Sequence, residues 1–192
     1  MSSSKSCWNC NKKIDNNAFF CESCKKVQKD FKVNPFKTFS LEKKYEIDLV
    51  KLEKRYLELQ QLLHPDKFIN CSDDEKSFSN SHSSNINNAY EQIKDSVKRI
   101  KILLHLEGYI IEDGNKSFKD VSMLEEIMEL QNDSMSVENE RESQKIQLLL
   151  KSKIDEEKKK VTNNLLKKKF EDVHKSYIKL SYLEKIIKNL RQ

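Results

Sequence analysis

Glycine and proline are scarce in this chain, with two of each among 192 residues. Sandwiches and barrels need turn residues every few positions, so this scarcity argues against both folds. Apolar runs are also short, and none approaches the roughly 18 residues that a membrane span requires. Residues 1–6 are too short for a secretory signal, and no Arg-rich amphipathic leader precedes Cys7. We therefore expect an intracellular protein without a membrane partner.

A strong excess of one charge is lacking as well. The sequence carries 36 basic and 31 acidic residues, which gives a net charge of +5, and 35% of its residues are charged. This balance is typical of a highly charged soluble surface rather than of a dedicated nucleic-acid binder. The 36% of hydrophobic residues are enough for a real core. The composition therefore favours an all-α protein.

Three regions can be distinguished along the chain by their breakers and periodicity. Residues 1–30 hold four of the five cysteines in a polar context and are too short for a core of their own. Residues 33–109 contain both prolines, whereas residues 117–192 contain neither glycine nor proline, so nothing interrupts long helices there. Residues 109–116 include Asp113-Gly114-Asn115 and are interpreted as a linker.

The middle region is expected to contain three main helices. Asp48 is a suitable N-cap, and apolar residues recur after it every three or four positions until Pro65 stops the helix. A second helix starts near Asp73, and a third ends where Gly108 can adopt a left-handed cap. The pattern also allows a short helix at residues 36–39. Packing positions on the first main helix are Leu52, Tyr56 and Leu59.

The C-terminal region fits three helices, at about residues 121–134, 137–166 and 170–190. Apolar residues recur at helical spacing in each of them. The last helix shows this most clearly, through Val173, Leu180, Leu183 and Ile187. We therefore predict a small three-helix bundle.

The cysteines form two C-x-x-C pairs, separated by ten residues. Each pair can bring two thiolates to one ion, and two such pairs close a tetrahedral zinc site with no open position, so its role would be structural. Two disulfides are an alternative that a reducing compartment disfavours, and iron in a rubredoxin-like site is another. Cys71 stands alone on a polar loop. The predicted ligands of one zinc ion are Cys7, Cys10, Cys21 and Cys24.

A tripeptide, His64-Pro65-Asp66, connects the first two main helices of the middle region. It is a weak motif by itself, but its context strengthens it. The preceding helix carries Lys51, Lys54 and Arg55 on its polar side, and the following helix would run antiparallel to it. Two antiparallel helices joined by a His-Pro-Asp loop are the arrangement of a J domain.

Longer strings around this motif resemble the HscB-type co-chaperones of iron–sulfur cluster assembly. The amino-terminal Cys7-Trp8-Asn9-Cys10 and Phe19-Phe20-Cys21 are similar to an extension found in animal members, and the resemblance runs from Cys7 to about Leu190. It implies a J domain at 33–109, followed by a client-binding three-helix bundle at 117–192. The other matching strings are 59–68 (LQQLLHPDKF), 86–90 (INNAY), 103–108 (LLHLEG) and 123–130 (MLEEIMEL).

The resemblance implies a partner for the His-Pro-Asp loop. In the family, the J domain contacts a DnaK-type chaperone, and the aspartate of the loop frees the partner's catalytic machinery so that ATP is hydrolysed. That role falls to Asp66, while His64 and Pro65 fix the loop. The basic side chains of Lys51, Lys54 and Arg55 would steer an acidic partner surface. Gln61 stands where some members have a basic residue, so this face is less positive here.

The resemblance also implies an exposed apolar patch that binds the iron–sulfur cluster scaffold protein. Leu124 and Met128 are four residues apart and share a helix face, and Glu129 matches an acidic position beside it. Periodicity alone favours packing inside the bundle instead, although Tyr182 lies off the core stripe of its helix. Asn132 departs from an acidic position of the family. The predicted scaffold-binding residues are Leu124, Met128, Glu129 and Tyr182.

The leading hypothesis is therefore an adaptor that joins a chaperone to a client and has no enzyme activity of its own. The alternative is a zinc-ribbon nucleic-acid-binding protein in which the tripeptide is accidental, with Trp8, Lys25 and Lys26 as its binding face. The family resemblance implies a mitochondrial location, and the missing leader adds a cytosolic pool. The sequence leaves homo-oligomerisation open.

Overall fold

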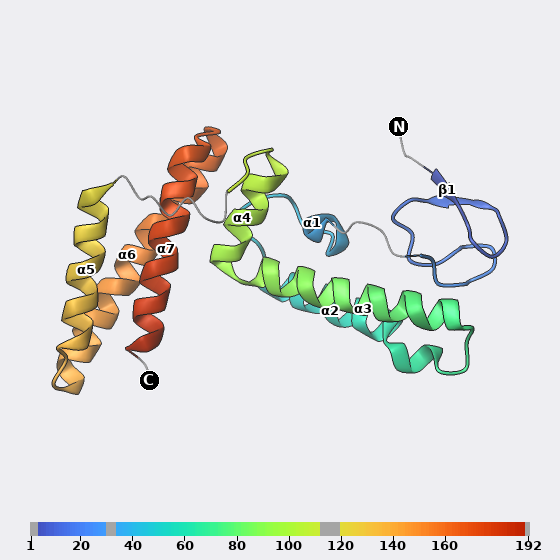
Figure 1. Ribbon diagram of the computed structural model, residues 1–192, viewed down its shortest axis with the longest axis horizontal. Helices are drawn as coiled ribbons and strands as arrows, with labels where there is room; N and C mark the ends of the chain where they lie inside the picture. The colour runs from blue at the N-terminus through green and yellow to red at the C-terminus, as the bar shows by residue number, and fades with distance from the viewer. Residues whose placement is uncertain (1–3, 30–33, 112–119, 191–192) are drawn as a thin grey trace. The chain divides into compact units, whose positions relative to one another are not determined.

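The computed structural model describes residues 4–29, 34–111 and 120–190, and its ribbon is drawn in Figure 1. The chain divides into two compact units. The first takes in the described residues of Met1–Lys43 and Ile47–Lys94, and the second those of Lys44–Glu46 and Asp95–Gln192. Among the described residues, no helix is both long and apolar enough to cross a membrane.

The first unit begins with a small hairpin that the sequence analysis did not predict. β1 (Ser4–Ser6) pairs antiparallel with β2 (Lys13–Asp15), so that Lys5 faces Ile14. The regular elements that follow in this unit are helices: α1 (Pro35–Thr38), α2 (Leu49–Leu63), the 3₁₀ turn η1 (Pro65–Phe68) and α3 (Asp73–Lys94). The prediction of an all-α fold with a small N-terminal extension is confirmed.

The structure confirms that α2 begins directly after Asp48, which caps the helix. The Asp48 carboxylate accepts a hydrogen bond from the backbone N–H of Lys51 over 3.0 Å. This satisfies one of the amide groups that a helix start leaves without a partner. Leu52, Leu59 and Leu63 are buried, as their spacing predicted.

α2 and α3 lie side by side and antiparallel (Figure 1). α3 contributes Ile86, Ala89 and Ile93 to the core between them. Tyr56 is only partly buried, and its ring stacks on Tyr90 with centroids 4.0 Å apart. The short helix α1 buries Phe36, and Phe39 just after it meets Tyr90 edge to face. These contacts hold the middle of α2 against the second half of α3, while the Ser79 hydroxyl in the first half of α3 donates to the Leu63 oxygen over 2.8 Å at the end of α2.

The second unit contains α4 (Ser96–Leu106), α5 (Val121–Met135), α6 (Glu140–Leu166) and α7 (Phe170–Asn189). α6 and α7 pack along their length, and α5 lies against both. The buried core of the three is formed mainly by Leu150, Ile154, Val161, Val173, Leu180 and Leu183. The three predicted bundle helices are therefore present. α6 begins at Glu140 and not at Val137 as predicted, because Asn139 accepts from the Glu142 N–H over 3.0 Å and caps the helix there.

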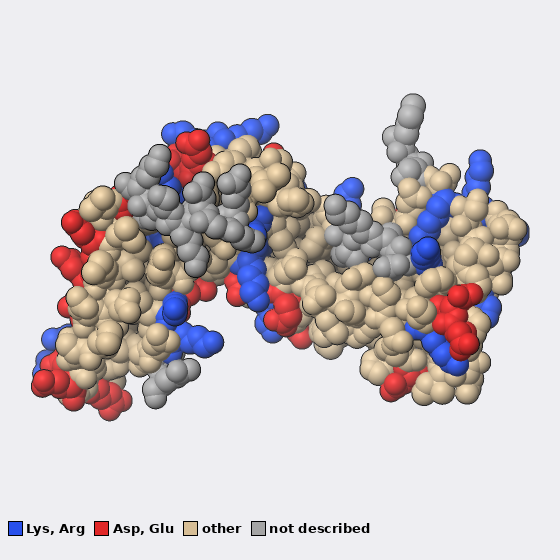
Figure 2. All heavy atoms as spheres, in the orientation of Figure 1, with Lys and Arg blue, Asp and Glu red and all other residues tan. Residues whose placement is uncertain are grey.

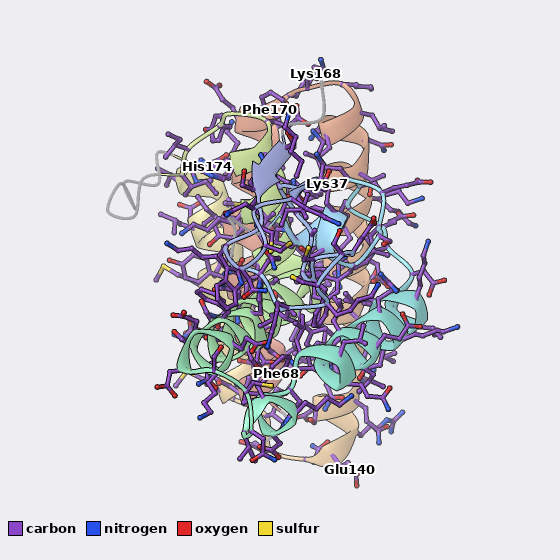
Figure 3. The ribbon with its side chains drawn as sticks, turned by 90° about the vertical axis from the view of Figure 1, so that its right-hand side faces the viewer. Lys37, Phe68, Glu140, Lys168, Phe170 and His174 are labelled. Carbon is purple, nitrogen blue, oxygen red and sulfur yellow. The ribbon has the colours of Figure 1, made fainter. Side chains whose placement is uncertain are left out.

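α4 packs on α7, although the sequence analysis had placed it in the region 33–109. Buried Arg99 donates to the backbone oxygen of Tyr45 over 2.7 Å, and Ser96 donates to Glu184 over 2.9 Å. The Tyr109 hydroxyl lies 3.2 Å from His174 Nδ1, and Figure 3 shows His174 one turn from Phe170 on α7. The predicted boundary between the middle and C-terminal regions, at residues 109–117, remains a prediction. Residues 112–119 lie outside the described residues.

Candidate functional site

The four N-terminal cysteines sit on two backbone turns of the same design. In the first turn, the Cys7 N–H donates to the Lys12 oxygen over 2.8 Å, and the Cys7 oxygen accepts from the Asn11 N–H over 3.0 Å. Cys21 repeats this pattern with Lys26 (3.0 Å) and Lys25 (2.8 Å). Asn11 and Lys25 both have positive φ, 59° and 60°. This conformation lets the backbone reverse its direction directly after Cys10 and again after Cys24.

The sulfur geometry fits a tetrahedral ion. Cys7 Sγ and Cys24 Sγ are 3.7 Å apart, Cys10 Sγ and Cys21 Sγ are 3.6 Å apart, and all four sulfurs lie within 4.8 Å of one another. A tetrahedral site with metal–sulfur bonds of about 2.3 Å needs sulfurs about 3.8 Å apart. A disulfide needs about 2.05 Å, so the alternative of two disulfides is wrong for this structure, in which all four thiols are free. The residues could thus hold one metal ion.

The surroundings of the thiols favour a bound cation. Burial raises the pKa of the Cys7 thiol, but the backbone N–H groups of Cys10 and Asn9 and the neighbouring thiols bring that pKa down to about 6. For Cys10, the backbone N–H of Lys12 lowers the pKa, whereas burial and the other three sulfurs raise it to about 11. Several thiolates so close together repel one another, and a divalent ion removes that repulsion.

The cysteine-bearing extension is docked on the first half of α3. Trp8 and Phe78 meet edge to face with ring centroids 5.7 Å apart, and the Trp8 indole N–H donates to the Val27 oxygen over 2.7 Å. His82 is buried, and its Nε2 lies 2.8 Å from the backbone oxygen of Gln28. Sequence reasoning missed His82, because a single histidine among polar residues gives no signal of burial.

The Gln28 side chain links this docking surface to the sulfurs. It is 1% exposed, and its amide donates to Cys7 Sγ (3.3 Å) and to the backbone oxygen of Lys26 (2.8 Å). Donors to a metal-bound thiolate orient it and tune its affinity for the ion. Gln28 is therefore a second residue of the site that sequence reasoning missed, since a glutamine four residues after Cys24 fits no spacing pattern of metal ligands.

The His-Pro-Asp turn is fixed by its backbone and presents its polar side chains to solvent. His64 ends α2, and its Nδ1 accepts from the Asp66 N–H over 3.3 Å at the start of η1. Pro65 occupies the first position of η1, where its fixed φ suits the turn. Phe68 is buried and lies between the ends of α2 and α3 in Figure 3. The Asp66 side chain, by contrast, is 77% exposed.

The basic side chains predicted beside this turn differ in their surroundings. Lys51 and Lys54 are exposed on α2, whereas Arg55 is partly buried and pairs with Glu58 on the next turn of the same helix. A shallow apolar groove follows α2 down to the turn, and Leu57, which is 57% exposed, is one of the residues that line it. The groove is lined by Lys54, Leu57, Glu58, Gln60, Gln61, His64, Asp66 and Lys67. Leu57 was missed because it fits neither the buried stripe nor the polar face.

The residues predicted for a scaffold lie on two helices that pack together, α5 and α7. Met128 is 62% exposed, Tyr182 is 40% exposed, Glu129 is exposed, and Leu124 is partly buried. Ile127 and Leu130 face inward from the same stretch of α5. None of the four predicted residues is therefore in the core, and the packing that periodicity favoured holds for their neighbours instead. Figure 2 shows acidic side chains along α5 and at its junction with α6.

Polar groups inside the bundle were not visible in the sequence. The buried carboxylate of Glu157 on α6 accepts from Ser176 of α7 over 3.0 Å and from Lys160 over 2.6 Å. Glu126 on α5 accepts from Lys153 of α6 and Lys179 of α7. The pairs between helices join residues that lie far apart in the sequence, so only the folded arrangement brings them together.

Comparisons with known proteins agree over nearly the whole chain. A family model described as the HSCB C-terminal oligomerisation domain matches residues 119–191. The iron-sulfur cluster co-chaperone protein HscB of Homo sapiens is 30% identical over 189 residues, which are 96% of this chain and 80% of that protein. The Arabidopsis thaliana homolog is 30% identical over 93% of this chain and 70% of its own length.

The likeness extends to the three-dimensional structure. The crystal structure of human co-chaperone protein HscB matches with a TM-score of 0.90 at 30% sequence identity, and the match covers 97% of both chains. Sequence identity of this level over most of both proteins, together with the shared fold and the four-cysteine cluster, shows that the chain belongs to the HscB family of iron–sulfur cluster co-chaperones.

Proposed function

We propose that this co-chaperone stimulates ATP hydrolysis by a DnaK-type chaperone through His64-Pro65-Asp66 and delivers the iron–sulfur cluster scaffold protein to that chaperone. The observation that carries the proposal is the presentation of Asp66. Its carboxylate is 77% exposed on a turn that His64, Pro65 and buried Phe68 hold in one conformation. A fixed and exposed carboxylate is suited to pair with an arginine of a partner.

The surface of α2 supports docking of the chaperone beside that turn. Leu57 offers an exposed apolar contact in the groove, which Lys54 and Lys67 also line. Together with Lys51, these charges favour encounter with an acidic surface, and the effect weakens as salt screens them. Arg55 contributes less, because Glu58 of the same helix already pairs with it.

The bundle supports binding of the scaffold. Met128 and Tyr182 expose apolar area on adjacent helices, and Leu124 extends it by one turn of α5. Exposed apolar side chains with a polar rim are typical of protein interfaces. The rim here includes the exposed Glu125, Glu129 and Asp133 of α5, so the matching scaffold surface is expected to be basic.

The four-cysteine site is proposed to hold one structural zinc ion. Bound to Cys7, Cys10, Cys21 and Cys24, zinc would supply a crosslink between the two turns that carry them. Four protein ligands leave no position for a substrate, so the metal takes no part in a reaction. The protein itself acts by coupling two partners and is not an enzyme. Family membership further suggests a mitochondrial location, with a cytosolic pool also proposed.

The nucleic-acid alternative loses two of the three residues that supported it, Trp8 and Lys26. The Trp8 ring is partly buried and meets Phe78 edge to face, and its N–H donates to the Val27 oxygen, so these contacts anchor Trp8 within the first unit. Lys26 is paired with buried Glu75 over 2.7 Å. Trp8 and Lys26 thus dock the extension on α3.

The steady-state ATPase rate of a DnaK-type chaperone tests the proposed function. The intact protein should stimulate this rate, the Asp66→Asn variant should not, and addition of the scaffold protein should raise the wild-type stimulation further. Asp73→Asn is a matched control, because Asp73 is likewise an exposed aspartate but lies on α3, seven residues beyond the turn. Its stimulation should equal that of wild type. Equal stimulation by Asp66→Asn and wild type would rule the proposal out.

A further inference from the structure

We infer that Glu75 positions the His-Pro-Asp turn and couples it to the metal ion in the four-cysteine site. The coupling gains its biological meaning from the proposed function of that turn, but it rests on contacts within the first unit alone. In these contacts, one carboxylate joins the extension, the start of α3 and the segment that leads back to the turn.

Glu75 is a buried charge with three donors on one oxygen. The residue is 3% exposed, and its Oε2 accepts from Lys26 Nζ over 2.7 Å, from Ser72 Oγ over 3.1 Å and from the Ser72 N–H over 3.4 Å. A buried carboxylate is costly unless such partners surround it. Lys26 is the only one of these donors that comes from the cysteine-bearing extension.

Ser72 connects Glu75 to the turn. It stands directly before α3, and its hydroxyl in return accepts from the Glu75 N–H over 3.4 Å. Only residues 69–71 separate it from Phe68, the last residue of η1, and the Cys71 N–H donates to the Phe68 oxygen over 2.9 Å. So short a connection cannot absorb a displacement of Ser72, which would therefore be passed to the turn.

Lys26 connects Glu75 to the metal site. It lies two residues after Cys24, and its backbone oxygen accepts from the Cys21 N–H within the second turn of the site. An ion bound to all four sulfurs would fix this turn and with it the position of the Lys26 backbone. Loss of the ion would leave only a few hydrogen bonds to hold Lys26 against Glu75.

The remainder of the same helix face supports this arrangement. Ser79, one turn after Glu75, is fully buried, and its hydroxyl donates to the backbone oxygen of Leu63 over 2.8 Å, directly before His64. His82, a further turn along, meets the Gln28 oxygen of the extension. The first half of α3 is thus held by the extension on one side and contacts the His-Pro-Asp turn on the other.

The coupling must act in both directions. If the bound metal stabilises the conformation of the turn that a chaperone recognises, then binding of the chaperone to the turn must raise the affinity of the cysteines for the metal by the same factor. Couplings of this kind are commonly fivefold or more, about 1 kcal/mol. We expect an effect of about fivefold here, because one buried ion pair carries it.

Hydrogen exchange of the intact protein tests the inference without any chaperone. Amides of residues 62–79 are compared in zinc-loaded protein and in protein stripped by a chelator under reducing conditions. In wild type, zinc should slow their exchange about fivefold. In Lys26→Met and in Glu75→Gln the effect should vanish while zinc stays bound. Lys76→Met is the control, because Lys76 forms only an exposed pair with Asp73 on the same turn of α3.

Each result has a definite meaning. Exchange of residues 62–79 that is the same with and without zinc in wild type would overturn the coupling. A zinc effect that survives in both Lys26→Met and Glu75→Gln would overturn the role of Glu75. If Lys26→Met should lose its zinc, Glu75→Gln decides, since Glu75 is remote in the chain from the four cysteines of the metal site. A failure of the ATPase experiment would leave this outcome unchanged, so the two proposals can fail separately.

Discussion

Lys179 on α7 donates a hydrogen bond to the Glu126 carboxylate on α5 over 2.5 Å. Lys153 of α6 binds the other oxygen of the same carboxylate over 2.6 Å. Apart from this charge, α5 is anchored by only two buried apolar residues, Ile127 and Leu130. Glu126 therefore contributes much of what holds α5, the helix that carries most of the proposed scaffold surface, against the other two.

Replacing Glu126 with Gln should release α5 more than it unfolds the bundle. The variant loses two charge-assisted hydrogen bonds and leaves two partly buried ammonium groups poorly paired, at a cost of about 1–3 kcal/mol. Urea unfolding should show this loss, and hydrogen exchange should quicken in α5 before α6 and α7. Glu125→Gln is the control, because Glu125 is exposed on the neighbouring position. Equal effects of the two variants would contradict the role of the pairs.

The same pairs predict a pH dependence. Burial raises the pKa of Glu126, but hydrogen bonds from Lys153 and Lys179 and their charges outweigh this and lower the pKa below its usual value. A carboxyl group with a lowered folded-state pKa stabilises the fold above its unfolded pKa, about 4.3, and the contribution is lost as the pH falls through the folded pKa. Docking of α5 in wild type should thus weaken below about pH 4, and Glu126→Gln should lack this step.

Tyr182 and Leu183 are neighbours in sequence with opposite environments, 40% and 0% exposed. Tyr182→Ala should cost less than about 1 kcal/mol, because no core contact is lost. It should nevertheless weaken capture of the scaffold protein. Leu183→Ala should cost about 2–5 kcal/mol through the cavity it leaves. Thermal unfolding and a pull-down with the scaffold distinguish the two, and a large loss of stability in Tyr182→Ala would remove this residue from the proposed interface.

Much of the fold could be predicted from the sequence because its signals are local. Asp48 as a cap, Pro65 as a stop and the apolar spacing of the bundle helices each involve residues within one or two turns, and the structure has helices at these places. The start of α6 was placed three residues early. Val137 fits an apolar pattern, but the side chain of Asn139 decides where the helix begins.

The candidate site was predictable only where spacing reveals it. Two C-x-x-C pairs predict four metal ligands, and the structure brings these cysteines together. Gln28, Glu75 and His82 are buried because the extension covers one face of α3, and no periodicity in either segment shows that the two will meet. Polar residues at a tertiary contact look like surface residues in the sequence, so the link between metal site and turn became visible only in the fold.

Cobalt substitution should show which cysteines hold the metal. In wild type, cobalt bound to four thiolates should give the strong visible absorption of a tetrahedral sulfur site. Cys10→Ser should weaken and shift this absorption, because only three thiolates remain, whereas Cys71→Ser should keep it, since Cys71 lies outside the cluster. The helical content should stay largely intact in both, because helices outside the extension carry nearly all of it. Retention of the full spectrum in Cys10→Ser would contradict the four-ligand site.

The ends of α4 and α6 allow a prediction about stability that is independent of any partner. Both helices end in the same motif, in which the second residue after the helix is left-handed: Gly108 with φ of 82° and Lys168 with φ of 55°. In α4, the Tyr109 N–H donates to the Leu104 oxygen over 2.9 Å. Lys169 and Asn164 form the equivalent bond of 2.9 Å in α6. Only the first end contained a glycine, so only the first could be predicted from sequence.

Replacing Gly108 with alanine and Lys168 with glycine should therefore have opposite effects on the free energy of unfolding. Gly108→Ala introduces a side chain that meets nothing within 4 Å, so its cost is the left-handed backbone alone, about 1–2 kcal/mol. Part of this is regained because alanine restricts the unfolded chain by about 0.4–1 kcal/mol, which leaves a net loss of about 0.5–1 kcal/mol. By the same reasoning, Lys168→Gly should gain about 0.5 kcal/mol. Urea unfolding of the two variants measures both, and a loss of stability in Lys168→Gly would show that the exposed Lys168 side chain contributes more than its backbone strain costs.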